Sequence, residues 1–396
     1  MEPVYLWYHL FVDFVGTSGA ALLTLALDCP VETEPAGWPG LTLGLFAQAR
    51  GQSLEQARPF YKNLMRSADR GILPAATRVV DAGGAIKFCL PAGFYNNKAL
   101  ETESVILPMR NAHGGTWYTL CVSSQVGCRM GCTFCQTGRM GLLSQLTAVQ
   151  IVQQFLVARR MLREQKNAVG IADTSAENVA AAADHPRLGG WQNPNRVAPN
   201  LIRNLVFMGM GEPLDNLDAV VQALGVLSDP AGINLPLSRI TVSTVGRIDG
   251  LRRLAKMDLP GLKLAISITA ANDQLRSKLM PINRAMPLAE LKQALMEYPR
   301  GRRTRFFIEY VLLAGVNDSP AHAMELVEWC RGLPVKINVI PYNPQQPTDF
   351  SAPADDVIVA FMETLRLNGI LAKRRVTIGQ DLMGACGQLG NPALRR

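Results

Sequence analysis

The sequence predicts an α/β fold in which six parallel strands form a partial (βα)6 barrel behind a small N-terminal accessory region. From residue 120 onward, short apolar runs rich in β-branched residues alternate with amphipathic helical patterns. Strands separated by helices pair in parallel, because a parallel connection needs a long crossover. In such a barrel, the reactive groups are expected at the carboxyl ends of the strands.

The elements follow from this alternation in chain order. The expected strands are residues 120–124, 204–210, 239–245, 262–269, 305–313 and 336–340. The helical patterns between them cover residues 148–165, 216–227, 249–257, 288–298 and 322–333. We therefore expect the barrel over residues 101–389 and a short tail over 390–396. An Ala-, Asn- and Pro-rich segment without clear periodicity, residues 167–200, is expected to be an exposed insertion.

Residues 1–100 are the expected accessory region. The first 30 residues are apolar, but they include Asp13 and carry Glu2 where a secretory signal would carry a positive charge. We therefore expect no membrane span or signal peptide, and this run fits either a buried helix or an upstream extension. A helical pattern follows over residues 53–71 and ends at Gly71.

Composition limits the class of protein without deciding the function. A chain of 396 residues does not need disulfide bonds to bury a core, so its eight cysteines have to be interpreted one by one. The net charge of +8 permits a polyanionic partner but does not prove one. Basic groups at residues 159–163, 300–305 and 373–375 could contact phosphate, but taken singly each fits an ordinary solvated face better.

Three cysteines in the spacing CxxxCxxC follow the first expected barrel strand. Cys128, Cys132 and Cys135 lie close enough in sequence to bind one soft metal centre, and Gly127 and Gly131 let the loop curl. A closed zinc site would need a fourth ligand, and no His or second cysteine pair follows nearby. An iron–sulfur cluster with three cysteine ligands would keep one iron open for substrate. The alternative is three unconnected buried thiols.

The motifs around these cysteines are more specific than their spacing. They are VSSQVGC at 122–128, GMGEPLDN at 209–216, RITVSTVG at 239–246, PIN at 281–283, EYVLLAGVND at 309–318, INVIPYNP at 337–344 and ACGQL at 385–389. With Phe134 before the last cysteine, the ordered set resembles the RlmN/Cfr family of radical S-adenosylmethionine (SAM) RNA adenine methyltransferases over roughly residues 101–389. The resemblance implies a radical SAM barrel with a [4Fe-4S] cluster on Cys128, Cys132 and Cys135.

The resemblance also assigns roles to residues outside the cluster loop. Cys386 matches the cysteine that one SAM methylates, and Cys121 matches the thiol that releases product by forming a transient disulfide. Glu103 matches the base that takes the proton from the methylated carbon. Glu101 lies two residues away and is a second candidate for this role. Alternatively, Glu103 is a solvated glutamate at a strand edge without a catalytic role.

The positions that match SAM contacts fall at expected strand ends. They are Gly211, Glu212, Ser243, Ser267, Ile268, Thr269 and Asn343. Two residues depart from the family pattern: Thr269 replaces its usual histidine, and Gln136 its usual serine. Both departures leave the mechanistic residues in place.

The resemblance implies methylation of an adenine carbon, C2 or else C8, in rRNA and also in tRNA, with two SAM per turnover. An electron-poor sp² carbon cannot attack an electrophilic methyl group, which is why a radical is needed. We expect a monomer in the reducing cytoplasm, served by a low-potential donor such as flavodoxin or ferredoxin. The alternatives are a radical SAM enzyme with another substrate and a non-catalytic metal- or RNA-binding module.

Overall fold

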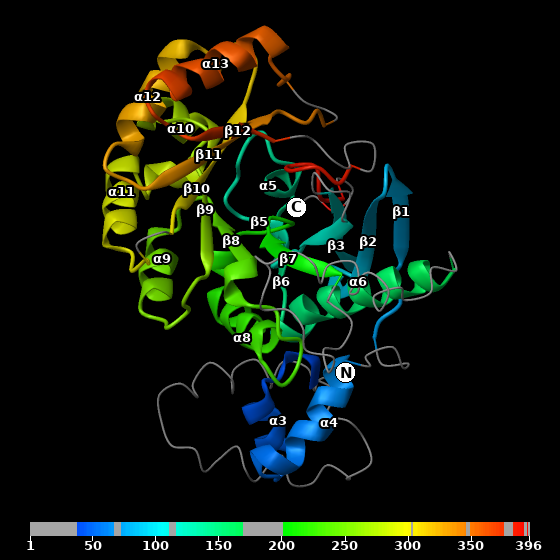
Figure 1. Cartoon of the computed structure of the whole chain (residues 1–396). Coiled ribbons are helices and arrows are strands. Elements are labelled where there is room, and N and C mark those ends of the chain that lie inside the picture. Colours follow the sequence, from blue (N-terminus) through cyan, green and yellow to red (C-terminus); the bar gives the residue numbers. More distant parts are fainter. Residues whose placement is uncertain are drawn as a thin grey trace, which may run out of the picture.

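The structure, a computed structural model, describes residues 38–66, 73–110, 116–168, 201–301, 304–345, 349–375, 383–391 and 394. The apolar run over residues 1–30, Gly71 and nearly all of the expected insertion lie outside these ranges. One ten-stranded sheet runs through the molecule in the order β1-β2-β3-β4-β7-β8-β9-β10-β11-β12, and Figure 1 shows it curving. Within the described ranges, no helix is both long and apolar enough to cross a membrane.

The parallel part of this sheet confirms the predicted fold class. Its strands are β4 (Thr116–Cys121), β7 (Ile202–Phe207), β8 (Ile240–Thr244), β9 (Lys263–Ser267), β10 (Phe306–Leu312), β11 (Val335–Pro341) and β12 (Ala372–Arg374). Each pairs in parallel with the next, so the six predicted strands are neighbours in chain order. The strand β12 extends the sheet by one strand beyond the prediction.

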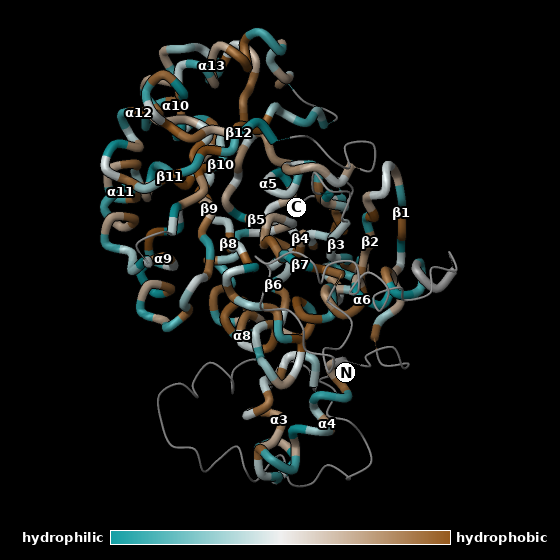
Figure 2. The backbone as a smooth tube through the Cα atoms, in the orientation of Figure 1, coloured by the Kyte–Doolittle hydropathy of each residue, from teal (hydrophilic) through white to brown (hydrophobic). Residues whose placement is uncertain are grey.

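Helices make the crossovers between these strands. They are α6 (Ala148–Ala168), α8 (Leu217–Ser228), α9 (Ile248–Ala255), α10 (Asp273–Leu279), α11 (Leu288–Glu297), α12 (Pro320–Cys330) and α13 (Asp355–Leu367). Short 3₁₀ turns, η3 (Pro213–Asp215), η4 (Leu237–Arg239) and η5 (Pro281–Arg284), complete the connections. The helices lie outside the curved sheet in Figure 1, and Figure 2 shows hydrophobic residues concentrated where helices face strands.

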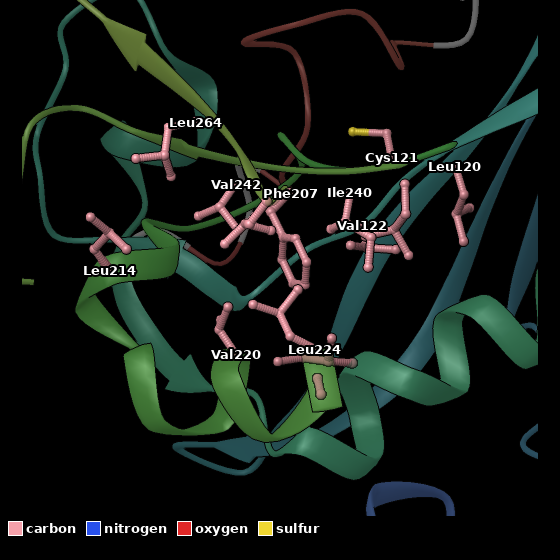
Figure 3. Packing of buried hydrophobic residues seen from close by; sticks show 14 of the residues in the cluster. Leu120, Cys121, Val122, Phe207, Leu214, Val220, Leu224, Ile240, Val242 and Leu264 are labelled. Atoms are coloured by element: carbon pink, nitrogen blue, oxygen red, sulfur yellow. The ribbon is translucent and has the colours of Figure 1, made fainter. Parts of the chain in front are cut away.

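The core forms where sheet and helices meet. Phe207 and Val242 of adjacent strands are buried against Val220 and Leu224 of α8 (Figure 3). All four side chains are 1% exposed or less. Residues of β8 alternate between buried and half-buried, whereas β9 is buried through its centre.

An antiparallel extension of the sheet was not predicted. The strands β1 (Arg78–Ala82), β2 (Ala85–Tyr95) and β3 (Lys98–Arg110) join the barrel through β3, which pairs antiparallel with β4. The two tight turns use Gly83-Gly84 and Asn96-Asn97, all with positive φ, as two-residue hairpins of this type require. The expected boundary between residues 100 and 101 falls inside β3.

The first described helices pack beneath the barrel. The turn η2 (Trp38–Gly40) lies against α6 and α8, and the helices α3 (Leu43–Ala49) and α4 (Leu54–Arg66) pack on each other. Arg159 of α6 donates to the Met65 carbonyl of α4. A side chain at Gly40 would come within 2.8 Å of Val149 on α6, so only glycine permits this approach. The Gln222 amide donates to the Gly40 carbonyl at 2.8 Å. The 53–71 pattern thus forms a helix, but the described helix ends at Arg66.

Candidate active site

The first barrel strand leads into a tightly bonded turn. In β4, Cys121 points away from the packed side chains of Leu120 and Val122 (Figure 3). Ser123 then donates through Oγ to the Glu103 carbonyl at 2.6 Å and accepts from the Met210 backbone N–H at 2.8 Å. The turn therefore connects β3 and β4 to the loop that follows β7.

The cysteine loop comes next and is shaped by glycine. Strand β5 (Gln125–Cys128) pairs with β6 (Gly141–Gln145), and Cys135 is the N-cap of the short helix α5 (Gln136–Arg139). Gly127 has φ +74°, and a Cβ there would overlap the carbonyl oxygen of Gly141. Glycine at this position therefore lets Cys128 enter the loop.

The loop lies in an apolar cup at the carboxyl ends of the strands. Cys128 and Cys132 are buried with Phe134, together with Ala270 after β9 and Tyr342 after β11. Burial raises the pKa of the Cys128 and Cys132 thiols, and each rises further through its cysteine neighbours in the loop. The three thiols are thus electrostatic neighbours at the end of the barrel where its chemistry is expected.

The chemistry of these residues fits an iron–sulfur cluster. Such a cluster binds each protein thiolate at a different iron, and its usual protein ligands are cysteines. Three thiolates at neighbouring positions of an apolar cup are the donor set that such a cluster takes.

Gly211 and Glu212 form a sharp turn after β7. Gly211 has φ +99°, and a Cβ there would lie 2.5 Å from the Gln125 side chain. The buried Glu212 carboxylate accepts the backbone N–H groups of Leu214 at 3.1 Å and Val245 at 2.8 Å. Burial raises the Glu212 pKa from 4.5 to about 7, against the lowering effect of those bonds. A carboxylate in this state would gain from a cationic ligand, such as an ammonium group.

The other expected SAM positions also lie at strand ends. Ser243 is in β8, Ser267 is the last residue of β9, and the Ile268 N–H donates to the Glu309 carbonyl at 3.0 Å. Thr269 is fully buried with φ +57°, a rare conformation for a β-branched residue, and its Oγ1 has no partner within the described structure. Strain and an unpaired buried hydroxyl at one residue are typical of a ligand site.

Cys386 lies on a loop from the other end of the chain. The Asn343 amide donates to the Cys386 carbonyl at 3.2 Å, and the Gln136 N–H donates to the Gly387 carbonyl at 2.8 Å. Cys386 is exposed, yet the surrounding protein limits hydration of its sulfur and raises its pKa, with Glu309 and Cys135 adding to the rise and Arg375 opposing it. Burial raises the Cys121 pKa to about 12, and Cys386 contributes to that rise. Cys386 is therefore an electrostatic neighbour of both Cys121 and the cluster loop.

Glu103 and Glu101 are in different surroundings. Glu103 is 3% exposed, forms an ion pair with Lys87 at 2.8 Å and accepts the Gly390 N–H at 3.2 Å, in the loop that carries Cys386. Glu101 forms an ion pair with exposed Arg78 at 2.8 Å. Of the two carboxylates, Glu103 is the one tied to the Cys386 loop.

Comparison with known proteins agrees with this geometry. A model of the radical SAM superfamily matches residues 122–327. The chain is 39% identical over 344 residues to the probable dual-specificity RNA methyltransferase RlmN 1 of Protochlamydia amoebophila, covering 87% of this chain and 83% of that protein. This chain belongs to the RlmN family of radical SAM methyltransferases.

A second curated relative and a solved structure agree. The dual-specificity RNA methyltransferase RlmN of Methylobacterium radiotolerans is 41% identical, with 79% of this chain and 69% of that protein covered. The crystal structure of a radical SAM methyltransferase from Sphaerobacter thermophilus matches with a TM-score of 0.72 at 34% identity, covering 89% of this chain and 99% of that one. The superfamily match ends before Cys386 and begins after Glu103 and Cys121, so these three residues lie outside the part common to radical SAM proteins.

Several residues of this RlmN-family site were not found from the sequence. Asn317 is fully buried and donates to the carbonyls of Thr269 at 2.6 Å and Val311 at 2.7 Å. Gln345 donates to Phe134 and Gly387, at 2.8 and 2.7 Å, and so joins the cluster loop to the Cys386 loop. Arg276 binds the ends of β8 and β9. Asn317 lies in the motif EYVLLAGVND, but no sequence pattern marks Gln345 or Arg276, which only the fold brings to the site.

One basic group that could have contacted phosphate has a structural role. Arg159 is 5% exposed and donates to the Met65 carbonyl at the end of α4. The exposed Arg374 forms an ion pair with Asp355 at 2.7 Å. Arg159 is thus not part of a solvent-facing basic surface.

Proposed function

We propose that this chain methylates a carbon atom of adenine in RNA, C2 or else C8, with Cys386 as the methyl carrier. The observation that carries the proposal is the position of the Cys386 loop, which is joined to the cluster loop through the Gln136 N–H and the Gln345 amide. Cys386 also contributes to the raised pKa of Cys121. A radical SAM enzyme that only abstracts hydrogen needs neither Cys121 nor Cys386. A thiol pair beside the cluster loop supports methyl transfer through sulfur.

Cys128, Cys132 and Cys135 would hold the [4Fe-4S] cluster. When bound, a cluster with one iron free of protein ligands supplies the electron that cleaves SAM to a 5′-deoxyadenosyl radical. The Glu212 carboxylate would accept hydrogen bonds from the amino group of SAM. Thr269, with its unpaired buried hydroxyl, would donate to or accept from SAM within the same strand-end site.

Cys386 would act first as a nucleophile. Its thiolate attacks the SAM methyl group, so that a sulfur–carbon bond forms and S-adenosylhomocysteine leaves. Only the thiolate can attack, and burial raises the Cys386 pKa, so the thiol has to lose its proton first. The positive charge of Arg375 favours the thiolate. A second SAM then serves the radical step, which makes two SAM per turnover.

Glu103 and Cys121 would complete the reaction. The 5′-deoxyadenosyl radical would take a hydrogen atom from the methyl group on Cys386, and the resulting carbon radical would add to adenine. Glu103 would then take the proton from the methylated ring carbon, and the unpaired electron of the adduct would return to the cluster held by Cys128, Cys132 and Cys135. The Cys121 thiolate then attacks the Cys386 sulfur, a disulfide bond forms, and the sulfur–carbon bond to the product breaks with its electron pair going to the product carbon, which takes up a proton. Cellular thiols would reduce the disulfide by two electrons before the next turnover.

The names of the relatives support RNA as the substrate, and the family's dual specificity favours rRNA with tRNA as a second target. The net charge of +8 is compatible with such a polyanion. A cluster that oxygen damages favours the cytoplasm, and a low-potential flavodoxin or ferredoxin would supply electrons to a monomeric enzyme.

Mass spectrometry of protein loaded with cluster and SAM tests the proposal. We expect one extra methyl group on the Cys386 peptide. We also expect Cys121→Ala to accumulate RNA covalently linked to Cys386, because the thiol that releases product is gone. The matched control is Cys330→Ala, which removes a buried thiol of α12 outside the site. An unmodified Cys386 in loaded protein, or multiple turnovers by Cys121→Ala, would contradict the assigned roles.

A further inference from the structure

Arg276 is a buried arginine whose hydrogen bonds within the described part of the chain all go to neutral groups. It lies in α10 and is 1% exposed. Its guanidinium donates to the carbonyls of Val245 at 2.6 Å, Ser267 at 3.2 Å and Ile268 at 3.3 Å, and to Asn283 Oδ1 at 2.6 Å. Within the described ranges, no carboxylate forms an ion pair with it.

Such a charge is costly without an opposite charge nearby. Burying an ion costs several kcal/mol unless it is paired, and neutral carbonyls offset only part of that cost. Burial lowers the Arg276 pKa to about 10, so the side chain remains protonated at neutral pH. Asp273 is near on the same helix, but its Oδ1 already accepts the Asn283 amide at 2.8 Å and the Leu288 N–H at 3.0 Å. The hydrogen bonds therefore leave the positive charge of Arg276 without a directly bonded anion.

The position of Arg276 points to the missing negative charge. The helix that carries Arg276 contacts the cluster loop directly, because the Thr133 N–H donates to the Leu279 carbonyl at 2.9 Å, and Leu279 and Met280 are buried together with Cys128 and Cys132. The carbonyls that accept from Arg276 lie at the carboxyl ends of β8 and β9. One of these residues, Val245, also donates its N–H to Glu212 at 2.8 Å. Arg276 thus lies behind the strand ends of the proposed SAM site and beside the cluster loop.

We infer that Arg276 is a positioning residue whose buried charge raises the reduction potential of the cluster on Cys128, Cys132 and Cys135. The inference rests on the proposed function, because it needs that cluster. A [4Fe-4S] core of charge 2+ with three thiolates is a net anion, and one-electron reduction makes it more negative. A fixed positive charge in a low-dielectric interior stabilises the reduced state more than the oxidised state. Reduction by a donor of given potential is then more favourable.

Redox titration of the anaerobically reconstituted protein, followed by electron paramagnetic resonance, tests the inference. We compare the wild type with Arg276→Gln, which removes the charge, and Arg276→Lys, which keeps it but loses the planar fork. We expect a clearly lower midpoint potential for Arg276→Gln and a near-native one for Arg276→Lys. The matched control is Lys278→Gln, because Lys278 lies on the same helix as Arg276 but is exposed and screened by solvent.

A further variant keeps the guanidinium in place. Asn283→Asp puts a carboxylate at the atom 2.6 Å from Arg276 Nη1 and should also lower the potential, even if Arg276→Gln does not fold. Equal shifts in Arg276→Gln and Arg276→Lys, no shift with Asn283→Asp, or a change in SAM affinity alone would overturn the inference. The last outcome would mean that the charge acts on the SAM carboxylate. Wild-type protein that binds no cluster would overturn the proposed function as well, whereas a loaded cluster of unchanged potential in every variant would overturn only the role of Arg276.

Discussion

Replacing Glu212 by Gln should change how folding stability depends on pH. The carboxyl group is 2% exposed, and burial raises its pKa from 4.5 to about 7. At about 1.36 kcal/mol per pKa unit, this shift corresponds to about 3 kcal/mol between the protonated and ionised forms. Glu212 is therefore a large single contributor to the pH dependence of stability.

The sign follows from proton linkage. Because the folded pKa lies above the unfolded one, the folded state binds the proton more tightly. The contribution of Glu212 to stability is fully present below pH 4.5 and is lost as the pH rises through about 7. Glutamine cannot ionise, so Glu212→Gln should lack this loss.

The substitution also has a cost that does not depend on pH. Both Glu212 oxygens accept a backbone N–H, from Leu214 and from Val245. Glutamine offers only one oxygen, so one buried N–H loses its acceptor at a cost of about 1–3 kcal/mol. We expect the variant to be less stable than the wild type at pH 5 and close to it, or more stable, at pH 8.

Urea unfolding of the cluster-free protein at several pH values measures the difference. The control is Glu290→Gln, since Glu290 is exposed at the start of α11 and should leave the pH profile unchanged. All other titrating groups are common to the variant and the wild type, so they cancel in the difference. A stability difference that stays constant between pH 5 and pH 8 would refute the reasoning.

Two further substitutions test how the loops are built. Gly127→Ala should reduce the iron bound per chain after reconstitution, because a Cβ at φ +74° would overlap the Gly141 carbonyl; Gly315→Ala, also at positive φ but in open space, is the control. Equal iron content in the two variants would count against a steric role for Gly127. Asn317→Ala should lower the free energy of unfolding by about 3 kcal/mol or more, because two carbonyls and one N–H lose their buried partner, while exposed Asn368→Ala should cost far less. Similar urea midpoints for these two variants would contradict that account.

The parallel strands could be predicted because short runs rich in apolar and β-branched residues alternate with amphipathic helical patterns along the chain. Even so, the expected strand over 262–269 is too long, since β9 ends at Ser267 and Thr269 has φ +57°. No propensity predicts a β-branched residue in that conformation, which the surrounding contacts impose. The cysteine spacing similarly predicted the loop, but not the apolar cup around it.

The antiparallel extension escaped prediction for a different reason. Strand β1 is exposed along most of its length, so it has no alternation of buried and exposed residues to detect. The Gly83-Gly84 and Asn96-Asn97 pairs were the available signal, since both suit two-residue hairpin turns. Without these hairpins in the prediction, the boundary at residue 100 appeared to separate two regions that one strand joins.

The same extension explains why the surroundings of Glu103 could not be predicted. Lys87 reaches the Glu103 carboxylate at 2.8 Å only because β2 and β3 pair in one particular register, with Cys89 opposite Glu103. A shift by one residue would turn Glu103 to the other face of the sheet. The Lys87 ammonium also donates to the Met383 carbonyl at 2.9 Å, so this lysine connects the hairpin to the loop that carries Cys386. Motif matching identifies Glu103 but not its neighbours. Lys87 on the neighbouring strand fixes its position, and that contact can be seen only once the pairing of the strands is known.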